Sequence, residues 1–185
     1  MSVNYCNQSC EFAFRGKRKT SVWIRRTAAA EGWETGAVSV VFCSDEALLE
    51  INRRYLKHDY YTDIITFDYS DPDKRTIAGD LMISVDTVRD NARELGVPFE
   101  NELQRVIIHG ILHLCGYGDK QPGEQQRMRK LEDRYLKLFY EHSAKWMRAP
   151  LRLNKRQGRI REGCGRERRK SVSAAGPNPE PGDRR

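Results

Sequence analysis

The chain has 185 residues, and its 33 Lys and Arg outnumber its 26 Asp and Glu, which gives a formal net charge of +7. Hydrophobic residues make up 38% of the chain and charged residues 32%, and no apolar run reaches the roughly 18 residues of a membrane-spanning helix, so the composition excludes an integral membrane protein. The N-terminal segment lacks a continuous apolar stretch, so no signal peptide is visible and we expect a cytoplasmic protein.

The periodicity of apolar residues and the capping signals predict four strands and five helices, in an order that mixes strands with helices and ends in a run of helices. The strands are expected at 3–14, on the edge of the sheet, and at 37–43, 62–69 and 79–84. The helices are expected at 19–33, 45–56, 86–95, 101–115 and 122–142. Ser44 is placed to cap the second helix, and Gly96 and Gly116 are placed to end the third and fourth. This order predicts an α+β fold, with a small mixed sheet of about four strands and helices packed mainly on one side.

The excess positive charge lies at the C-terminal end of the chain. Residues 148–185 contain 12 Lys and Arg against 4 Asp and Glu, a net charge of +8, whereas residues 1–147 have a net charge of −1. The C-terminal segment is also rich in Gly, Pro and Ser and has few residues that can be buried. We therefore expect a folded domain over 1–147 and a basic, disordered tail over 148–185. The tail is either a solubilising extension or an arm that binds nucleic acid through its phosphates.

The cysteines are odd in number and lack paired CxxC spacing, which is typical of reduced, unconnected thiols in a reducing compartment. They are Cys6, Cys10, Cys43, Cys115 and Cys164. Cys115 lies two residues beyond His113, so we expect it to point away from the face of that histidine and to be a core thiol.

Two of the four histidines have the spacing of metal ligands. His109 and His113 lie four residues apart in a predicted helix, so their side chains share one face, one turn apart. Gly116 can end the helix and turn the chain back, which brings Asp119 to the site six residues after His113. This spacing resembles that of the metzincin proteases. Three protein ligands leave a fourth position open, as in catalytic zinc sites, so we predict one Zn²⁺ per chain at a catalytic centre.

Gly110 argues against a peptidase, because zinc peptidases place a glutamate general base directly after the first histidine. The site keeps its ligands, and a metal there can polarise a phosphodiester instead. A metal-free alternative also exists, in which the two histidines are a hydrogen-bonded pair in the core. Gly116 and Asp119, which stand three and six residues after His113 as in the metzincin spacing, favour the metal site. His58 and His142 have no neighbour at ligand spacing and are expected on the surface.

Three stretches, in order, resemble the YbeY family of bacterial endoribonucleases. HGILHLCGYGDK is similar to the family signature H-G-x-L-H-L-x-G-Y-D-H. INRRYLKHDYYTDIITF is similar to L-N-x-x-Y-R-x-K-D-x-x-T-D-V-L-S-F, and GDLMIS is similar to G-D-I-x-I-S. The resemblance covers roughly residues 35–140, and the tail has no counterpart in the family pattern. It implies a zinc-dependent, single-strand-preferring ribonuclease that acts in maturation of ribosomal RNA and in ribosome quality control.

The resemblance also assigns residues, with two departures. His109 and His113 match the first two metal ligands, and Asp119 stands where the family has a third histidine. Leu56 stands where the family has an arginine thought to contact RNA or assist catalysis, and a leucine cannot donate to a phosphate. Asp63 and Asp80 match family positions, and Asp63 is either a residue that fixes its loop or a simple turn residue.

The body of the chain is almost neutral, so contact with RNA needs a local basic patch or the tail. One candidate RNA-binding patch consists of Arg53, Arg54 and Lys57. A second consists of Arg127, Arg129, Lys130, Arg134 and Lys137. For most of these residues the sequence favours an ordinary solvated helix face.

Several functions stay open at this point. The first is a zinc-dependent, single-strand-specific endoribonuclease that processes precursor ribosomal RNA (16S rRNA), with the small ribosomal subunit as a partner. The second is a ribosome-associated RNA-binding assembly factor with weak or no nuclease activity, which Leu56 and the basic tail favour. A zinc peptidase is the third, and Gly110 disfavours it.

Overall fold

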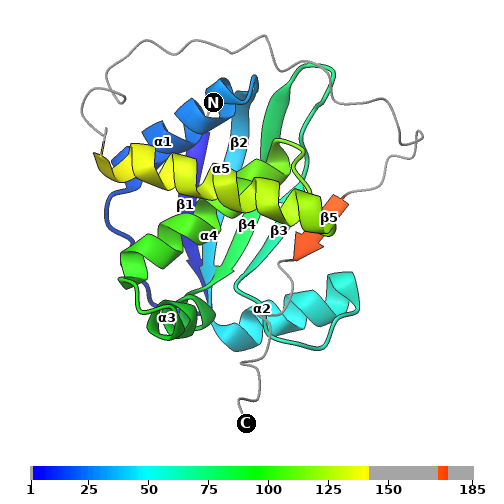
Figure 1. Ribbon diagram of the computed structural model, residues 1–185. Helices are drawn as coiled ribbons and strands as arrows, with labels where there is room; N and C mark the ends of the chain where they lie inside the picture. Colours follow the sequence, from blue (N-terminus) through cyan, green and yellow to red (C-terminus); the bar gives the residue numbers. More distant parts are fainter. Residues whose placement is uncertain (1, 142–170, 175–185) are drawn as a thin grey trace.

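The structure, a computed structural model, describes residues 2–141 and 171–174. Its strands are β1 (Ser2–Gln8), β2 (Glu34–Cys43), β3 (Ile64–Asp68), β4 (Thr76–Ser84) and β5 (Ser171–Ala174). Its α-helices are α1 (Lys17–Ala30), α2 (Asp45–Ile51), α3 (Val85–Glu94), α4 (Phe99–Leu114) and α5 (Pro122–Glu141). A π-helical stretch, η1 (Asn52–Leu56), continues α2. The predicted α+β class is confirmed (Figure 1).

The strands form one mixed sheet in the order β1-β2-β4-β3-β5. β1 and β4 run parallel to β2, whereas β3 runs antiparallel to both β4 and β5. The four predicted strands are therefore present. The connection between β3 and β4 is shorter than the gap between the strands predicted at 62–69 and 79–84, because Asp71 and Thr76 pair through two backbone hydrogen bonds of 2.8 and 3.0 Å and close it. For this reason β4 begins at Thr76 rather than at Gly79.

On β2, β3 and β4, apolar side chains alternate between two clusters, one on each face of the sheet. On β2, Val38, Val40 and Phe42 belong to the large cluster, which also contains the buried side chains of α1, α4 and α5. Val41 and Cys43 face the other way, into a small cluster with Leu48 of α2. Most helices therefore cover one face, as predicted, while α2 and η1 lie at one end of the opposite face (Figure 1).

Helix α4 ends in a motif that aims the following loop. Gly116 has φ +89°, a conformation that glycine adopts without strain. Its N–H bonds the carbonyl of His113 at 2.8 Å, and the N–H of Tyr117 bonds the carbonyl of Leu112 at 3.1 Å. These two bonds form a Schellman motif, which satisfies carbonyls at the helix end and reverses the chain direction. The predicted helix stop at Gly116 is therefore confirmed, and the chain that leaves α4 turns back toward the helix.

Two further features of the sheet differ from the prediction. The strand expected at 3–14 ends at Gln8, because Ser9 adopts a left-handed conformation with φ +57°. β5 was not predicted at all, since it lies within the expected disordered tail and pairs with the outer edge of β3. The other tail residues, and the expected boundary at 147, lie outside the described residues. Within the described part of the chain, no helix is both long and apolar enough to cross a membrane.

Candidate metal centre

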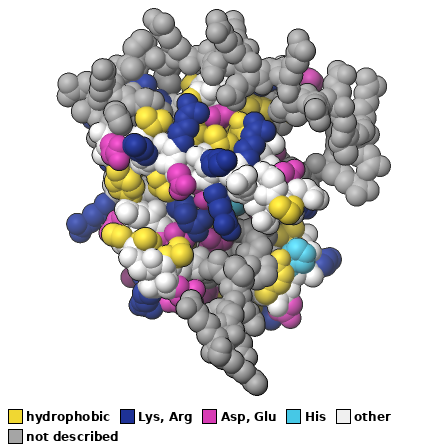
Figure 2. All heavy atoms as spheres, in the orientation of Figure 1, with side chains coloured by type: hydrophobic (Ala, Val, Ile, Leu, Met, Phe, Trp, Pro, Cys, Tyr) yellow, Lys and Arg dark blue, Asp and Glu magenta, His cyan; other side chains and the backbone are white. Residues whose placement is uncertain are grey.

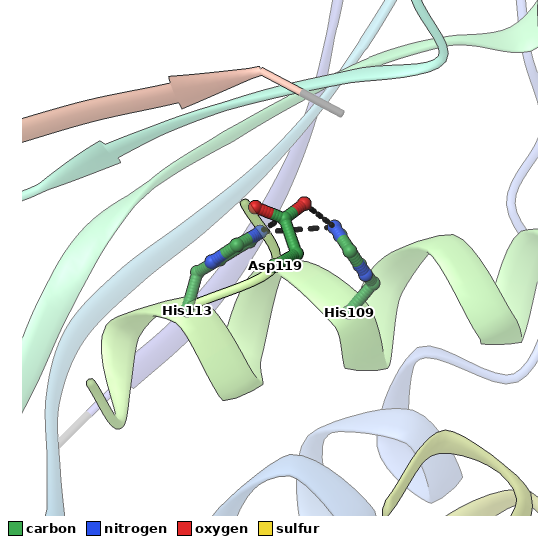
Figure 3. A group of neighbouring side chains, drawn as sticks. All are labelled: His109, His113 and Asp119. Atoms are coloured by element: carbon green, nitrogen blue, oxygen red, sulfur yellow. Dashed lines mark hydrogen bonds and ion pairs between the residues drawn. The ribbon is translucent and has the colours of Figure 1, made fainter. Parts of the chain in front are cut away.

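His109, His113 and Asp119 meet in space as the sequence predicts (Figure 3). The two imidazoles project from α4 toward each other, with their Nε2 atoms 2.9 Å apart. Asp119 lies on the loop after the Schellman motif, and its Oδ2 is 3.6 Å from Nε2 of His109 and 3.5 Å from Nε2 of His113. Ligands held tetrahedrally at about 2.0–2.1 Å from a zinc ion lie roughly 3.3 Å from one another. The three atoms therefore have nearly the spacing of one face of a zinc coordination shell.

The orientation of both rings supports a cation between them. Nδ1 of His109 is 2.7 Å from a carboxylate oxygen of Glu132, and Nδ1 of His113 is 2.8 Å from the carbonyl oxygen of Tyr117. Because these oxygens only accept hydrogen bonds, each Nδ1 carries the donated proton. In the neutral rings, both Nε2 atoms then direct lone pairs at each other and at the Asp119 carboxylate. A bound metal ion relieves this convergence of lone pairs, so the residues present fit a metal.

Glu132 is a buried carboxylate of α5, with 5% of its surface exposed, that links His109 to a guanidinium group. Burial alone would raise the pKa of Glu132, but the hydrogen bond from His109 and the charge of Arg105 hold this pKa below its ordinary value. Arg105 lies 3.6 Å from Glu132 and 3.9 Å from Asp63, and it also pairs with Glu102. The ring of His109 is thus held by an ionised carboxylate, which makes its Nε2 a better metal ligand.

Asp119 is also ionised in this arrangement. When the ring of His113 is protonated, its Nε2 donates to this carboxylate, which lowers the pKa of the Asp119 carboxyl below its ordinary value, and the nearby imidazole of His109 acts in the same direction. Asp63 behaves in the opposite way, because burial raises the pKa of its carboxyl although Arg105 and His109 partly offset the effect. Asp119 is therefore the more acidic of the two groups.

Gly110 faces the sheet and not the metal centre. A Cβ atom built at Gly110 would lie 2.7 Å from a side-chain carbon of Leu81 and 2.8 Å from one of Ile64. The residue after the first histidine therefore lies where α4 packs directly on the sheet, and it has no room for a side chain. A glutamate there would collide with the sheet, so this chain has no place for the general base of a zinc peptidase at that position.

The predicted RNA-binding patch of Arg53, Arg54 and Lys57 lies on η1 and the residue that ends it. Arg53 forms an exposed ion pair with Asp59. Arg54 lines a pocket together with Glu50, Asp80 and apolar residues of the α2 side of the sheet. Helix α4, which carries the two histidines, packs its buried apolar side chains into the large cluster on the opposite face. The structure therefore places Arg54 on the face opposite α4, and the contact of this patch with RNA stays a prediction.

Leu56, at the position of the family arginine, packs against the small apolar cluster. It is half-buried and contributes to the core at this position. The predicted core thiol at Cys115 is buried, and burial raises its pKa. His58 is exposed and stacks on Tyr60, as expected for a surface residue, whereas His142 lies outside the described residues.

The second basic patch lies on α5, and Lys and Arg side chains gather over this helix in the surface view (Figure 2). One of them is close to the metal loop, since the guanidinium carbon of Arg127 is 4.8 Å from the ring centre of Tyr117. Tyr117 itself supplies the carbonyl that holds His113. The structure thus brings Arg127, rather than Arg54, next to the residues that form the site.

Sequence reasoning missed the residues that orient the ligands. Glu102 and Arg105 could have been noticed, because they precede His109 by seven and four residues and continue its polar stripe along an otherwise apolar helix. Glu132 carried no comparable signal. It is 23 residues from His109 in the chain and meets it only because α5 packs against α4. The Tyr117 contact uses a backbone carbonyl, which no side-chain pattern reveals.

Known proteins are similar to this chain in sequence and in fold. A family model described as Endoribonuclease YbeY matches residues 4–140. The Endoribonuclease YbeY of Bacteroides thetaiotaomicron is 50% identical over 138 residues, which make up 75% of this chain and 99% of that relative. The Endoribonuclease YbeY of Flavobacterium psychrophilum is 46% identical over 134 residues, which make up 72% of this chain and 94% of that relative.

A solution structure of a Thermotoga maritima protein has a similar fold, with a TM-score of 0.54 and 24% sequence identity, over 76% of this chain and 91% of that protein. The sequence matches carry the assignment, because they span nearly the whole length of relatives that share about half of their residues with this chain. The chain belongs to the YbeY family of endoribonucleases.

Proposed function

We propose that this chain is a zinc-dependent, single-strand-specific endoribonuclease that acts on precursor ribosomal RNA. The observation that carries the proposal is the convergence of Nε2 of His109, Nε2 of His113 and Oδ2 of Asp119 within 4.8 Å of one another. Two imidazoles and one carboxylate suit zinc among the first-row ions. Family membership supports RNA as the substrate class.

Each residue of the centre has a role in this proposal. His109, His113 and Asp119 hold the ion. A zinc ion in this site supplies Lewis-acid polarisation to a scissile phosphodiester. Glu132 and the carbonyl of Tyr117 keep both rings in the tautomer that presents Nε2 to the ion. His113 and Asp119 are partly exposed, so an RNA strand has access to the site from the solvent side.

The direct test measures metal content and RNA cleavage in the same preparations of the full chain. Wild-type protein should contain about one zinc per chain and should cleave single-stranded RNA faster than a duplex of the same sequence. His113→Ala should lose both properties. His58→Ala should keep both, because His58 is exposed and is not one of the residues that converge at the candidate metal centre. Full cleavage by metal-free His113→Ala protein would refute the proposal.

A second candidate function is a ribosome-associated RNA-binding factor with weak or no nuclease activity. The inward packing of Leu56 at the family arginine position favours it, because one group that can donate to a phosphate is missing. This function predicts that ribosomal RNA association survives the His113→Ala change and that the wild type has no measurable cleavage. The two functions therefore differ in the activity of the wild-type protein.

The proposed partners are single-stranded precursor ribosomal RNA and the small ribosomal subunit, in the cytoplasm. Free cysteines within the described part of the chain, including buried Cys43 and Cys115, support a reducing compartment. Binding of RNA can be assigned by comparing two sets of variants. If the predicted patch binds RNA, changing Arg53, Arg54 and Lys57 to Ala weakens binding more than Arg127→Ala does. The position of Arg127 beside the metal loop favours the reverse order.

A further inference from the structure

A buried carboxylate outside the metal centre has two tyrosine hydroxyls as its partners. Glu31 follows the end of α1 and has 4% of its surface exposed. The hydroxyl of Tyr117 donates to one of its oxygens at 2.5 Å, and the hydroxyl of Tyr135 donates to the other. Each oxygen of this buried carboxyl group thus has a hydroxyl donor, and a buried oxygen left without its donor costs free energy. The ring of Tyr117 is therefore held by a contact with a residue far away in the sequence.

Tyr117 connects Glu31 to the metal centre through its backbone. Its hydroxyl binds Glu31 and its carbonyl oxygen accepts from Nδ1 of His113 at 2.8 Å. The residue before it is Gly116, at the turn that ends α4, and Asp119 follows two residues later. The hydrogen bond from the N–H of Tyr117 to the carbonyl of Leu112 fixes the backbone on one side of this residue, and the hydroxyl contact with Glu31 fixes its side chain, so the two contacts together set the direction of its carbonyl.

Helix α5 holds both ends of this arrangement. Glu132 on α5 binds His109, and Tyr135, one turn later on the same face, binds Glu31. The indole of Trp23 in α1 donates to the carbonyl of Tyr135 at 3.0 Å, which fixes α5 against α1. His109 is therefore tied to α5 directly, whereas Tyr117 reaches Glu31 through a hydrogen bond of its own, to the carboxyl oxygen that Tyr135 does not use.

We propose that Glu31 and Tyr117 are positioning residues of the metal centre, which set the orientation of the His113 ring and the path of the loop that carries Asp119. The inference deepens the proposed function and rests on it, since it takes His113 and Asp119 as metal ligands. Groups that orient a metal ligand typically change metal affinity by 10- to 100-fold when they are removed. Neither residue touches the ion in this assignment.

Tyr117→Phe and Tyr135→Phe are a matched pair that tests this inference. Each removes one hydroxyl from the same buried carboxylate, but only the first frees the side chain that fixes the His113 partner. Zn²⁺ is removed from the full chain and Co²⁺ is titrated in, with its visible absorption spectrum as the readout of ligand geometry. Thermal unfolding of the metal-free variants measures their loss of stability separately.

Tyr117→Phe should weaken Co²⁺ binding about tenfold and change the spectrum, whereas Tyr135→Phe should change the dissociation constant less than about threefold at a similar loss of stability. If Tyr117→Phe does not fold, Glu31→Gln serves instead and should show the same direction. If the two tyrosine changes alter the Co²⁺ dissociation constant equally, or if neither alters it, the inference is overturned. The proposed function still stands in that case, provided that the wild-type chain binds Co²⁺. A wild-type chain that binds neither Co²⁺ nor Zn²⁺ would overturn both.

Discussion

The two histidines of the metal centre are oriented by chemically different groups. His109 donates to an ionised carboxylate of Glu132, whereas His113 donates to the neutral carbonyl of Tyr117. A carboxylate acceptor shifts more electron density onto the ring than a carbonyl does, so it raises the basicity of the opposite nitrogen more strongly. We therefore expect His109 to be the stronger ligand of the two, and Glu132 to matter more for metal affinity than its distance from the ion suggests.

Glu132→Gln should lower zinc affinity about tenfold. The amide keeps the size of the side chain but removes its charge, and its NH₂ group can turn toward Nδ1 and favour the wrong tautomer. Competition with a zinc-binding dye measures the dissociation constant. Asp133→Asn is the control, because it removes the same charge from the next residue of α5, on its exposed face. An unchanged affinity in Glu132→Gln would show that this carboxylate does not orient His109.

The metal-free protein should lose stability in acid partly through the ligand carboxylate. In acid the ring of His113 is protonated, and its hydrogen bond to Asp119 sets the pKa of that carboxyl below its ordinary value in the folded state. The stability that this provides is complete above the pKa of an unfolded aspartate, about 3.9, and is lost as the pH falls through the lower folded-state pKa. Asp119→Asn should therefore flatten the decline of the unfolding free energy below about pH 4. Urea titrations of metal-free protein across this range test it, and parallel curves would contradict it.

At the scale of elements, α4 serves the site and the core at once. Its polar stripe carries both histidines, and the opposite side packs so closely on the sheet that Gly110 leaves no room for a Cβ atom. The position of the metal ligands therefore depends on how tightly this helix lies on β3 and β4. A change at Gly110 reaches the centre through the helix position, although Gly110 does not face the ligands.

Gly110→Ala should destabilise the protein by about 1–3 kcal/mol, because the added methyl group collides with Leu81 and Ile64. Helix propensity acts in the opposite direction, since alanine is better than glycine in a helix by about 1 kcal/mol. Gly123→Ala in α5 is the matched control, because nothing lies within 4 Å of its added Cβ atom, and it should be neutral or slightly stabilising. Urea unfolding of both variants measures the difference, and equal stabilities would refute the close helix–sheet contact.

The sequence was sufficient for features that depend on local spacing. The i, i+4 histidine pair, the helix stop at Gly116 and the returning Asp119 all follow from helix geometry, and the structure brings the three ligand side chains together. The carboxylates that support the centre were not predictable in this way. Glu31 and Glu132 reach it only through the packing of α1 and α5 against α4, and such packing is decided by the whole core rather than by a pattern in either helix.

The contrast between local patterns and long-range contacts also explains which strands of the sheet were predicted and which were not. Strands with alternating or β-branched residues, such as 37–43, were identified from sequence. β5 has no such pattern, because its residues Ser171–Ala174 are mostly small and lie in a segment rich in Gly, Pro and Ser. Its strand form depends on pairing with the edge of β3, which is a long-range contact.

For the whole molecule, the catalytic body and most of the positive charge occupy different parts of the chain. The family match ends at residue 140, and a relative matched over 99% of its length is covered by 138 residues of this chain. The net charge of +8 over residues 148–185 lies beyond that match. We therefore expect the body to carry metal binding and cleavage, and the tail to add affinity for RNA that does not depend on sequence.

A chain shortened to residues 1–147 should keep its zinc and its cleavage of single-stranded RNA, and should bind RNA more weakly and with less dependence on salt. The logarithm of the binding constant falls linearly with the logarithm of the salt concentration. For a single strand, each phosphate that the protein no longer neutralises makes this negative slope shallower by about 0.7. Fluorescence anisotropy with a labelled RNA at several salt concentrations measures this slope. Shortening also removes β5, so a full-length chain with its 12 tail Lys and Arg changed to Ser is the control, which leaves Ser171–Ala174 unaltered. If that chain keeps the wild-type slope, the charges of the tail do not contact RNA.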